Sequence, residues 1–552
     1  MTASTPSYDV LIHGGTVYDG SGSPPFVGDV AIQGDTIAAV GAAGPAARGR
    51  VDVDVHVDAA GLAVAPGFVN MLSWAAEALI ADGRSQSNIR QGVTLEVFGE
   101  GRSMGPLTDA MKRDDRERQG DIQYEIAWTT LGESLEYLQR RGIACNVASF
   151  VGATTLRVHE VGHEDRRPTT DELDRMCWLA RQAMEEGALG VGSSLIYAPA
   201  FYAGTDELVA LVRATAPYGG MYISHLRSEA AHLQDAVDEL ITIARRAGAP
   251  AEIYHLKAAG AANWSKMDAV IDQVQSARAE GLRITADLYP YTAGSTGLNA
   301  TMPPWVQEGG HQAWVARLRD PSIRARLRQE MASPTDQWEN MLLMAGSPDN
   351  ILLVGFQSEA LKPLTGKTLA EVAALRRATP EDTIMDLVIE DHSRVQAIYF
   401  MIDEDNMRKA IRQPWVSFGS DASSQAPEGV FLQSSTHPRA YGCFARVLGR
   451  YVRDERIIPL AEAVRRLSRL PADNLALERR GRLAEGYFAD VVVFDPDRIQ
   501  DHATYQRPQQ YATGVEHVFV NGVQVLKNGE HTGATPGRFL RGAGYRGVAA
   551  RQ

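Results

Sequence analysis

Apolar and polar positions alternate in the first 65 residues, in short runs that glycine and aspartate interrupt, at 8–20, 28–41 and 51–67. A period of two places successive side chains on opposite faces of a strand, which predicts antiparallel strands with one face towards water. The same texture returns after about residue 479, in the runs 486–496 and 517–530. We therefore expect one small β-sandwich built from both chain ends, residues 1–65 and 479–552.

Between these ends, in residues 66–478, short β-rich runs alternate with stretches of helical periodicity. The runs 144–153, 221–226 and 251–260 each lead into such a stretch, at 169–188, 230–248 and 266–281. Strands that alternate with helices are typical of a parallel sheet with helical crossovers. The number of units favours a closed (β/α)8 barrel of the TIM type over an open sheet, so the expected fold class is α/β.

The alternation pauses from about residue 292 to 350, in a stretch rich in Pro, Trp, Arg and Gln. We interpret this stretch as an insertion in the barrel or as a lid. The β-rich pattern resumes in the runs 351–356, 395–402 and 415–421, which are predicted to be the last barrel strands.

The overall charge of the chain argues against two classes of binding partner. The 552 residues carry a formal charge of −13, which argues against a general nucleic-acid binder and against docking on anionic membranes. No apolar run is long enough to span a membrane, and the N-terminus has no signal-peptide pattern, so we expect a soluble cytoplasmic protein. The three cysteines, Cys145, Cys177 and Cys443, are far apart in sequence. This spacing argues against a disulfide scaffold and against a zinc ribbon.

Three polar residues stand where predicted barrel strands end and catalytic loops begin. His225 and His255 follow neighbouring strands, so their imidazoles are close enough to share one metal ion. Two unrelated polar residues at strand ends are the alternative. Asp421 ends the last predicted strand, where a carboxylate can ligate a metal or shuttle a proton, or simply make a turn.

The segment from His159 to His163 matches the H-E-x-x-H pattern of zinc proteases. That pattern needs a helix to place both histidines on one face. Gly162 lies inside the motif and Pro168 follows it, so we expect a connecting segment before a helix that starts near Thr169 or Thr170. The protease interpretation is therefore disfavoured, although His163 remains a candidate to line a pocket from its loop.

Several blocks of the sequence resemble the amidohydrolase superfamily and, within it, the D-aminoacylases, which are N-acyl-D-amino-acid deacylases. The blocks occur in the family's order and include APGFVNM, GSSLIYAPAFYAGTDEL, YISHLRSE, YHLKAAG, ITADLYPYTAGST, FGSDAS and THPRAYGCFARVLGRYV. The resemblance implies a barrel with a split β-sandwich and a small inserted domain after Tyr291. It also implies a metal-dependent hydrolase that cleaves the amide of an N-acyl-D-amino acid, or of a related acylated amino acid or peptide, through a metal-activated water.

The resemblance also assigns site residues. His225 and His255 fall on the family's metal-binding histidines, and Asp421 falls on its catalytic aspartate. Four further positions fall near the substrate carboxylate, for which cations and directed donors are suited; they are Lys257, Tyr289, Ser295 and, as a weaker candidate, Arg439. The implied partner is a small-molecule substrate that bears a carboxylate.

Two departures from the family pattern change the expected metal site. Leu72 and Trp74 stand where most amidohydrolases have a His-x-His pair, so the usual second metal position lacks its ligands. The turn that carries a cysteine ligand in D-aminoacylases here offers Glu100, with Glu96 as a weaker alternative. Glu100 is competent as an oxygen ligand, and a paired turn carboxylate is the alternative. We expect one zinc ion per chain, held by Glu100, His225 and His255.

Two other classes of function remain open on sequence alone. The missing His-x-His pair favours a non-catalytic binding or assembly protein on an amidohydrolase frame, and the retained His225, His255 and Asp421 speak against it. A metal-dependent lyase or isomerase would use the same residues. The sequence leaves homo-oligomer formation open as well.

Overall fold

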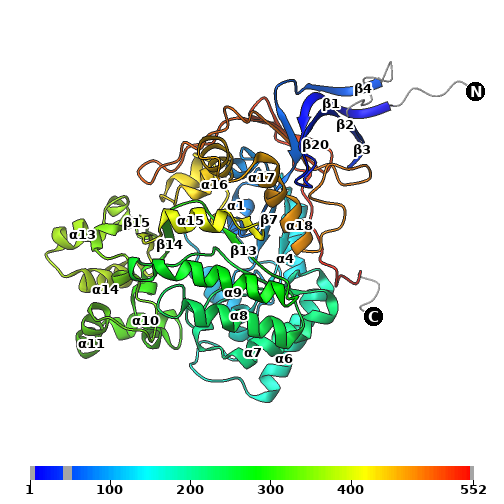
Figure 1. Cartoon of the computed structure of the whole chain (residues 1–552). Helices are drawn as coiled ribbons and strands as arrows, with labels where there is room; N and C mark the ends of the chain where they lie inside the picture. The colour runs from blue at the N-terminus through cyan, green and yellow to red at the C-terminus, as the bar shows by residue number, and fades with distance from the viewer. Residues whose placement is uncertain (1–6, 42–51, 548–552) are drawn as a thin grey trace, which may run out of the picture.

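The two ends of the chain meet in one nine-stranded sheet. The computed structural model describes residues 7–41 and 52–547, and Figure 1 shows strands of this sheet at the upper right of the view. The strand order is β21-β20-β19-β18-β5-β1-β2-β3, with β4 beside β1. The antiparallel pair of β18 and β5 joins the C-terminal to the N-terminal part. The strands are β1 (Ser7–Val17), β2 (Phe26–Gln33), β3 (Thr36–Gly41), β4 (Asp52–Asp58), β5 (Ala63–Pro66), β18 (Val491–Phe494), β19 (Val515–Val520), β20 (Val523–Lys527) and β21 (Glu530–His531).

Parallel strands form the centre of the chain. One sheet has the order β17-β13-β12-β11-β10-β9 and another the order β6-β7-β8, and every neighbouring pair in both is parallel. Their residues are buried throughout, which is why these segments read as apolar runs rather than as alternation. The strands are β6 (Phe68–Asn70), β7 (Val93–Phe98), β8 (Asn146–Ser149), β9 (Val151–Gly152), β10 (Gly190–Ser194), β11 (Met221–His225), β12 (Ala251–Ile253), β13 (Ile284–Leu288) and β17 (Val416–Phe418).

Backbone hydrogen bonds link the two parallel sheets. The N–H of Asp421 donates to the carbonyl of Leu72 over 2.9 Å, and the N–H of Trp74 donates to the carbonyl of Ala422 over 3.0 Å. These bonds place the residues after β6 beside the residues after β17. Because β8 runs directly into β9, the carboxyl ends of β6, β7, β11, β12 and β17 all belong to one connected parallel array.

Helices cover this array, and their ends follow local chemistry. Thr169 caps α6 in a reciprocal capping box with Glu172, which confirms the predicted helix start, and Gly187 ends the helix at a φ of 111°. The helices of this part are α1 (Ala76–Ala81), α2 (Gln86–Ile89), α3 (Asp109–Glu117), α4 (Leu131–Arg141), α5 (Ala153–Glu160), α6 (Thr170–Glu186), α7 (Thr205–Thr215), α8 (Leu233–Ala247), α9 (Met267–Ala279), α15 (Glu404–Ile411), α16 (Arg439–Arg446), α17 (Leu460–Leu467) and α18 (Arg469–Asn474).

A separate lobe interrupts the array between β13 and α15, and Figure 1 shows it projecting at the left, away from β1, β2, β3 and β4. It contains a three-stranded antiparallel sheet with the order β14-β16-β15 and a buried apolar core of its own. Its elements are β14 (Ala293–Gly297), α10 (His311–Leu318), α11 (Pro321–Ala332), α12 (Met341–Met344), β15 (Ile351–Gly355), α13 (Leu369–Arg376), α14 (Pro380–Asp391) and β16 (Gln396–Phe400).

This lobe corrects two strand predictions. The runs 351–356 and 395–402 were predicted as barrel strands, but they form β15 and β16, which pair with each other, and β16 also pairs with β14. An apolar run followed by helices looks the same whichever sheet it joins, because periodicity reports burial and not the identity of the partner strand. The insertion therefore continues past residue 350.

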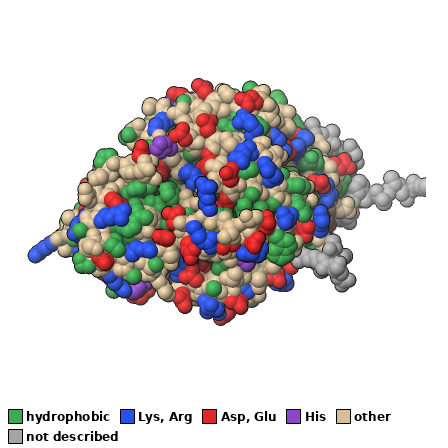
Figure 2. All heavy atoms as spheres, turned by 90° about the horizontal axis from the view of Figure 1, so that it is seen from below, with side chains coloured by type: hydrophobic (Ala, Val, Ile, Leu, Met, Phe, Trp, Pro, Cys, Tyr) green, Lys and Arg blue, Asp and Glu red, His purple; other side chains and the backbone are tan. Residues whose placement is uncertain are grey.

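The surface carries charges of both signs. Figure 2 shows Lys and Arg side chains interspersed with Asp and Glu over the face that it presents. Within residues 7–41 and 52–547, no helix combines the length and the apolar character that crossing a membrane requires.

Candidate active site

Glu100, His225 and His255 converge at the carboxyl ends of three parallel strands. Glu100 follows β7, His225 is the last residue of β11, and His255 follows β12. Oε1 of Glu100 lies 3.1 Å from Nδ1 of His225 and 3.0 Å from Nε2 of His255. All three side chains are buried, and their candidate ligand atoms lie within 4.8 Å of one another. The structure therefore brings together the three residues that the sequence suggests as metal ligands.

Local backbone geometry places these side chains. Gly99 and Gly101 flank Glu100 with φ angles of 109° and 71°, and a Cβ at either position would lie 2.5 Å from another part of the chain. Only glycine suits both positions. His255 itself has a φ of 37°, and its N–H donates to Oδ1 of Asp287 over 2.9 Å, which helps to hold this uncommon conformation.

A second buried carboxylate, Glu229, lies behind both histidines. Its Oε1 is 3.1 Å from Nδ1 of His255, and its Oε2 is 3.7 Å from Nε2 of His225. Lys257 donates to Oε1 of Glu229 over 2.6 Å. The ring nitrogens that face away from Glu100 thus face Glu229, an arrangement that orients metal-binding imidazoles. Sequence reasoning missed Glu229, although its position four residues after His225 in HLRSE was a usable signal.

Charge neighbours lower the pKa of both buried glutamates. Burial raises the pKa of Glu100, but hydrogen bonds from His225 and His255 outweigh it and bring the pKa below its ordinary value. Burial also raises the pKa of Glu229, and the charges of Lys257 and the two histidines reverse that effect. Both carboxylates are therefore ionised at neutral pH, the form that can ligate or orient.

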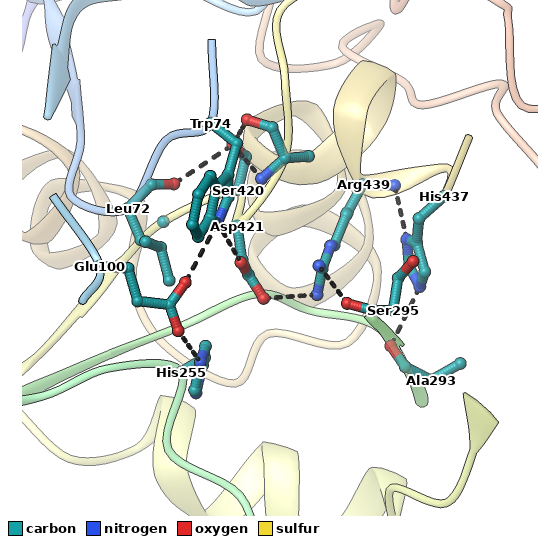
Figure 3. A network of polar contacts seen from close by, with 12 residues as sticks. Leu72, Trp74, Glu100, His255, Ala293, Ser295, Ser420, Asp421, His437 and Arg439 are labelled. Atoms are coloured by element: carbon teal, nitrogen blue, oxygen red, sulfur yellow. Dashed lines mark hydrogen bonds and ion pairs between the residues drawn. The ribbon is translucent and has the colours of Figure 1, made fainter. Parts of the chain in front are cut away.

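Asp421 faces this cluster from the end of β17 (Figure 3). It adopts a left-handed backbone with a φ of 48°. Its Oδ2 pairs with Nη1 of Arg439 over 2.8 Å, and its Oδ1 accepts from Nε1 of Trp74 over 3.1 Å. Burial raises the pKa of Asp421 above its ordinary value, Arg439 opposes this shift, and the charge of Glu100 adds to it.

The four candidate substrate-binding residues occupy different environments. The ring of Tyr289 lies 4.3 Å from the guanidinium of Arg439 and 5.7 Å from Nζ of Lys257, so these three groups lie together beside the cluster. The hydroxyl of Ser295 instead donates to the carbonyl of Ala397 over 3.0 Å, inside the antiparallel sheet of the lobe. Arg439 and Lys257 are both engaged with carboxylates of the protein itself.

The two residues at the missing His-x-His positions differ in exposure. Leu72 is fully buried and packs in the core among Val69, Met71 and Leu95. Trp74 is 47% exposed, and its indole N–H lies 3.1 Å from Oε2 of Glu100. Neither side chain offers a metal ligand at this place.

Glu96, the weaker ligand candidate, and His437 both lie outside the cluster. Glu96 is fully buried and accepts hydrogen bonds from the side-chain amides of Asn70 and Asn88, each over 2.8 Å, so its carboxylate is occupied elsewhere. His437 is also buried, and its ring joins the carbonyl of Ala293 to the N–H of Arg439, each over 3.0 Å. This fixes the backbone that carries Arg439.

The H-E-x-x-H segment is partly helical, contrary to expectation. Helix α5 spans Ala153–Glu160 and buries Leu156 and Arg157, and Arg157 pairs with Glu207 over 2.7 Å. This packing outweighs the weak helix propensity of Thr154 and Thr155, the β-branched residues near the start of α5. The helix ends before His163, so His159 and His163 do not share a helical face, and neither belongs to the cluster of Glu100, His225 and His255.

The donor set of the cluster fits a zinc ion. Two imidazole nitrogens and one carboxylate oxygen are ligands that Zn²⁺ prefers, and three protein ligands are typical of hydrolytic sites. Nε2 of His225 is buried and makes no hydrogen bond within the described residues, and Oε2 of Glu229 lies 3.7 Å from it. The site thus combines converging ligands, a supporting carboxylate and a separate Asp–Arg pair at one rim.

Known proteins share this architecture. Residues 56–526 match the model of the amidohydrolase family. A D-aminoacylase of Alcaligenes xylosoxydans xylosoxydans is 32% identical over 537 residues, which cover 97% of each chain. A solved D-aminoacylase with a binuclear metal centre has a TM-score of 0.79 at 30% identity, covering 97% of this chain and 100% of that one.

A further solved relative carries zinc. It is an N-acyl-D-glutamate deacylase from Bordetella bronchiseptica, in complex with zinc and a phosphonate that mimics the tetrahedral intermediate. Its TM-score is 0.78 at 29% identity, with 97% of this chain and 100% of that chain covered. The family model matches most of the sequence and the D-aminoacylase covers 97% of it, so the chain belongs to the amidohydrolase family.

Proposed function

We propose that this protein is a metal-dependent amidohydrolase that cleaves the amide bond of N-acyl-D-amino acids. The observation that carries the proposal is the convergence of Glu100, His225 and His255 opposite the Asp421–Arg439 pair. The identities of the relatives, a D-aminoacylase and an N-acyl-D-glutamate deacylase, support the same substrate class.

We assign the metal to a single zinc ion held by Glu100, His225 and His255. When bound, zinc lowers the pKa of a water molecule and polarises an amide carbonyl. Glu229 orients both imidazoles from behind and keeps their metal-facing nitrogens directed at Glu100. Leu72 and Trp74 supply no ligands for a second ion, which supports a count of one.

Asp421 is the proton carrier in this proposal. Its carboxylate takes a proton from the attacking water and returns it to the nitrogen of the leaving amine as the amide bond breaks. A pKa that burial raises above the ordinary range suits this exchange, because the group must both accept and release a proton near neutral pH. Arg439 holds Oδ2 of Asp421, so that Oδ1 remains on the side of Glu100.

The substrate carboxylate is assigned to the group formed by Arg439, Lys257 and Tyr289. Two cations and a phenolic hydroxyl provide the directed donors that a carboxylate requires. Ser295 contributes through its place beside Arg439, whose Nη2 donates to the Ser295 carbonyl over 3.5 Å. The hydroxyl of Ser295 is engaged within its sheet, so it joins the carboxylate site only if that bond opens.

The finer architecture follows the same reasoning. We infer a closed (β/α)8 barrel over residues 66–478, because backbone bonds join the ends of β6 and β17. We also infer a β-sandwich from residues 1–65 and 479–552, of which 1–6, 42–51 and 548–552 lie outside the described residues. The insertion, expected over 292–350, is extended to about 402, because β14 pairs with β16.

The proposal is tested with enantiomeric substrates. Zinc-loaded enzyme is incubated with matched N-acetyl-D- and N-acetyl-L-amino acids that carry apolar, acidic and basic side chains, and release of free amine is measured. We expect hydrolysis of D substrates at least about tenfold faster than of their L partners, since the site must fix handedness by about 1.4 kcal/mol or more. Absence of hydrolysis for every pair overturns the proposed function, and equal rates overturn the D preference.

A further inference from the structure

The indole N–H of Trp74 points between the two carboxylates of the site. Nε1 lies 3.1 Å from Oε2 of Glu100 and 3.1 Å from Oδ1 of Asp421. Figure 3 shows the indole with one dashed contact to each carboxylate, and Arg439 on the far side of Asp421. One donor is therefore shared by the candidate metal ligand and the candidate proton carrier.

The backbone fixes this arrangement. The N–H of Asp421 bonds to the carbonyl of Leu72 over 2.9 Å, and the N–H of Trp74 bonds to the carbonyl of Ala422 over 3.0 Å. The segments that carry Trp74 and Asp421 are thus held side by side by two bonds that do not involve their side chains. The backbone therefore keeps the indole of Trp74 within reach of the Asp421 carboxylate.

The N–H of Trp74, which bridges Glu100 and Asp421, serves two acceptor oxygens that have no other side-chain donor in the part of the chain that the structure describes. Oε1 of Glu100 serves His225 and His255, and Oδ2 of Asp421 serves Arg439. Within the described residues, the remaining oxygens, Oε2 of Glu100 and Oδ1 of Asp421, receive a side-chain donor only from Trp74. Without a donor between them, the oxygens of buried Glu100 and of Asp421, whose side chain is 11% exposed, would repel each other and carry the cost of lost hydration.

We propose that Trp74 is a positioning residue that sets the orientation of Asp421 through this shared N–H. The inference rests on the proposed function, in which Asp421 carries the proton. An indole keeps its proton at every physiological pH and does not ligate zinc. Trp74 therefore supplies a permanent neutral donor between two negative groups, at a position where a histidine would change its charge or compete for the metal.

The first test measures exchange of the indole N–H with water and needs no substrate. Zinc-loaded enzyme labelled with ¹⁵N-tryptophan is studied by NMR, and the Trp74 resonance is assigned by its loss in Trp74→Phe. Trp178 is the control, because it is 53% exposed and its indole N–H has no bond to any described residue. We expect Trp74 to exchange about tenfold more slowly than Trp178, as one hydrogen bond of ordinary strength predicts. Equal exchange rates overturn the bridge.

The second test separates positioning from a merely structural role. Trp74→Phe keeps an aromatic ring and removes the donor, and Trp178→Phe is the matched control. We expect Trp74→Phe to lower kcat about 10- to 100-fold, a part of what general acid–base catalysis contributes, with KM within about threefold and zinc content unchanged. An unchanged kcat, or a loss that follows loss of zinc, overturns the proposal. Inactive wild-type enzyme counts against the proposed function. The exchange rates of the two indole N–H groups still show whether Trp74 is hydrogen-bonded to the carboxylates.

Discussion

Lys257 and Glu229 form a buried ion pair, with 2.6 Å between Nζ and Oε1, directly behind the two histidines of the site. Nζ of Lys257 also lies 2.8 Å from Nδ1 of His255. A residue assigned to the substrate carboxylate is thus also part of the scaffold that holds a candidate metal ligand. Substitution of Lys257 will therefore change stability as well as substrate binding.

Removal of one partner of this pair leaves the other charge buried and unpaired. We expect Lys257→Met to lower the free energy of unfolding by about 3–5 kcal/mol, and Lys257→Met combined with Glu229→Gln to lose less than the sum of the single changes. Urea unfolding monitored by circular dichroism measures both. The control is Lys409→Met, whose surface pair with Asp268 should matter by less than about 1 kcal/mol. Additive losses would show that the two side chains do not interact.

Glu229 should act on the metal through the histidines. We expect Glu229→Gln to weaken zinc binding about 10- to 100-fold, because the supporting carboxylate no longer orients the imidazoles. Competition with a fluorescent zinc chelator measures the dissociation constant. Glu359→Gln, at an exposed glutamate of the lobe, serves as the matched control and should bind zinc as the wild type does. Wild-type affinity in Glu229→Gln would remove this role.

Asp421 should be needed for turnover and not for metal binding. Asp421→Asn keeps the size of the side chain but cannot carry the proton, so kcat should fall about 10²- to 10⁴-fold. Zinc content should stay at the wild-type value, because Asp421 is not among the three clustered ligands. Elemental analysis measures the zinc content, and amine release from the same preparation measures kcat. Loss of zinc from Asp421→Asn would instead make Asp421 a ligand.

Glu252, in β12, should make stability depend on pH. Burial raises the pKa of its carboxyl from 4.5 to about 7, while hydrogen bonds from Thr285 and Asn474 oppose the shift. The folded protein thus keeps the proton where the unfolded chain has lost it. Protonated Glu252 therefore contributes to the free energy of unfolding in full below pH 4.5. This contribution falls as the pH rises and is lost above about pH 7, a change of about 3 kcal/mol.

The neutral variant Glu252→Gln isolates this contribution. Its free energy of unfolding should change less between pH 5 and pH 8 than that of the wild type, and the difference between the two proteins should grow with pH. Urea unfolding at several pH values provides the comparison. Parallel pH profiles of the two proteins would show that Glu252 titrates normally in the fold.

The sequence was informative where chemistry coincides with regular structure. His225 and His255 stand at the ends of two neighbouring strands, so parallel pairing alone predicts that their rings meet, and the structure places the ring centroids 4.5 Å apart. Glu100 could be predicted because the family resemblance marks its turn as the position of a metal ligand. Glu229 was missed because it lies in a loop whose return path beneath the histidines is set by tertiary contacts, including three bonds to Glu339 from the lobe.

The errors in the fold have a common cause. The runs that form β15 and β16 carry the same hydrophobic pattern as barrel strands, but the pattern holds no information about the partner strand, and both join β14 in the antiparallel sheet of the lobe. Helix α5 was missed because the local sequence disfavours a helix, whereas burial of Leu156 and Arg157 stabilises one. In each case a contact distant in sequence decided between two conformations that the local residues allow.

The number of zinc ions per chain tests the central claim most directly. Purified wild-type enzyme and Glu100→Ala are saturated with zinc, freed of excess metal and analysed by elemental mass spectrometry. A centre built from Glu100, His225 and His255 predicts a ratio near one for the wild type and near zero for Glu100→Ala. A wild-type ratio of two, or a Glu100→Ala ratio equal to that of the wild type, would contradict the single centre that we propose.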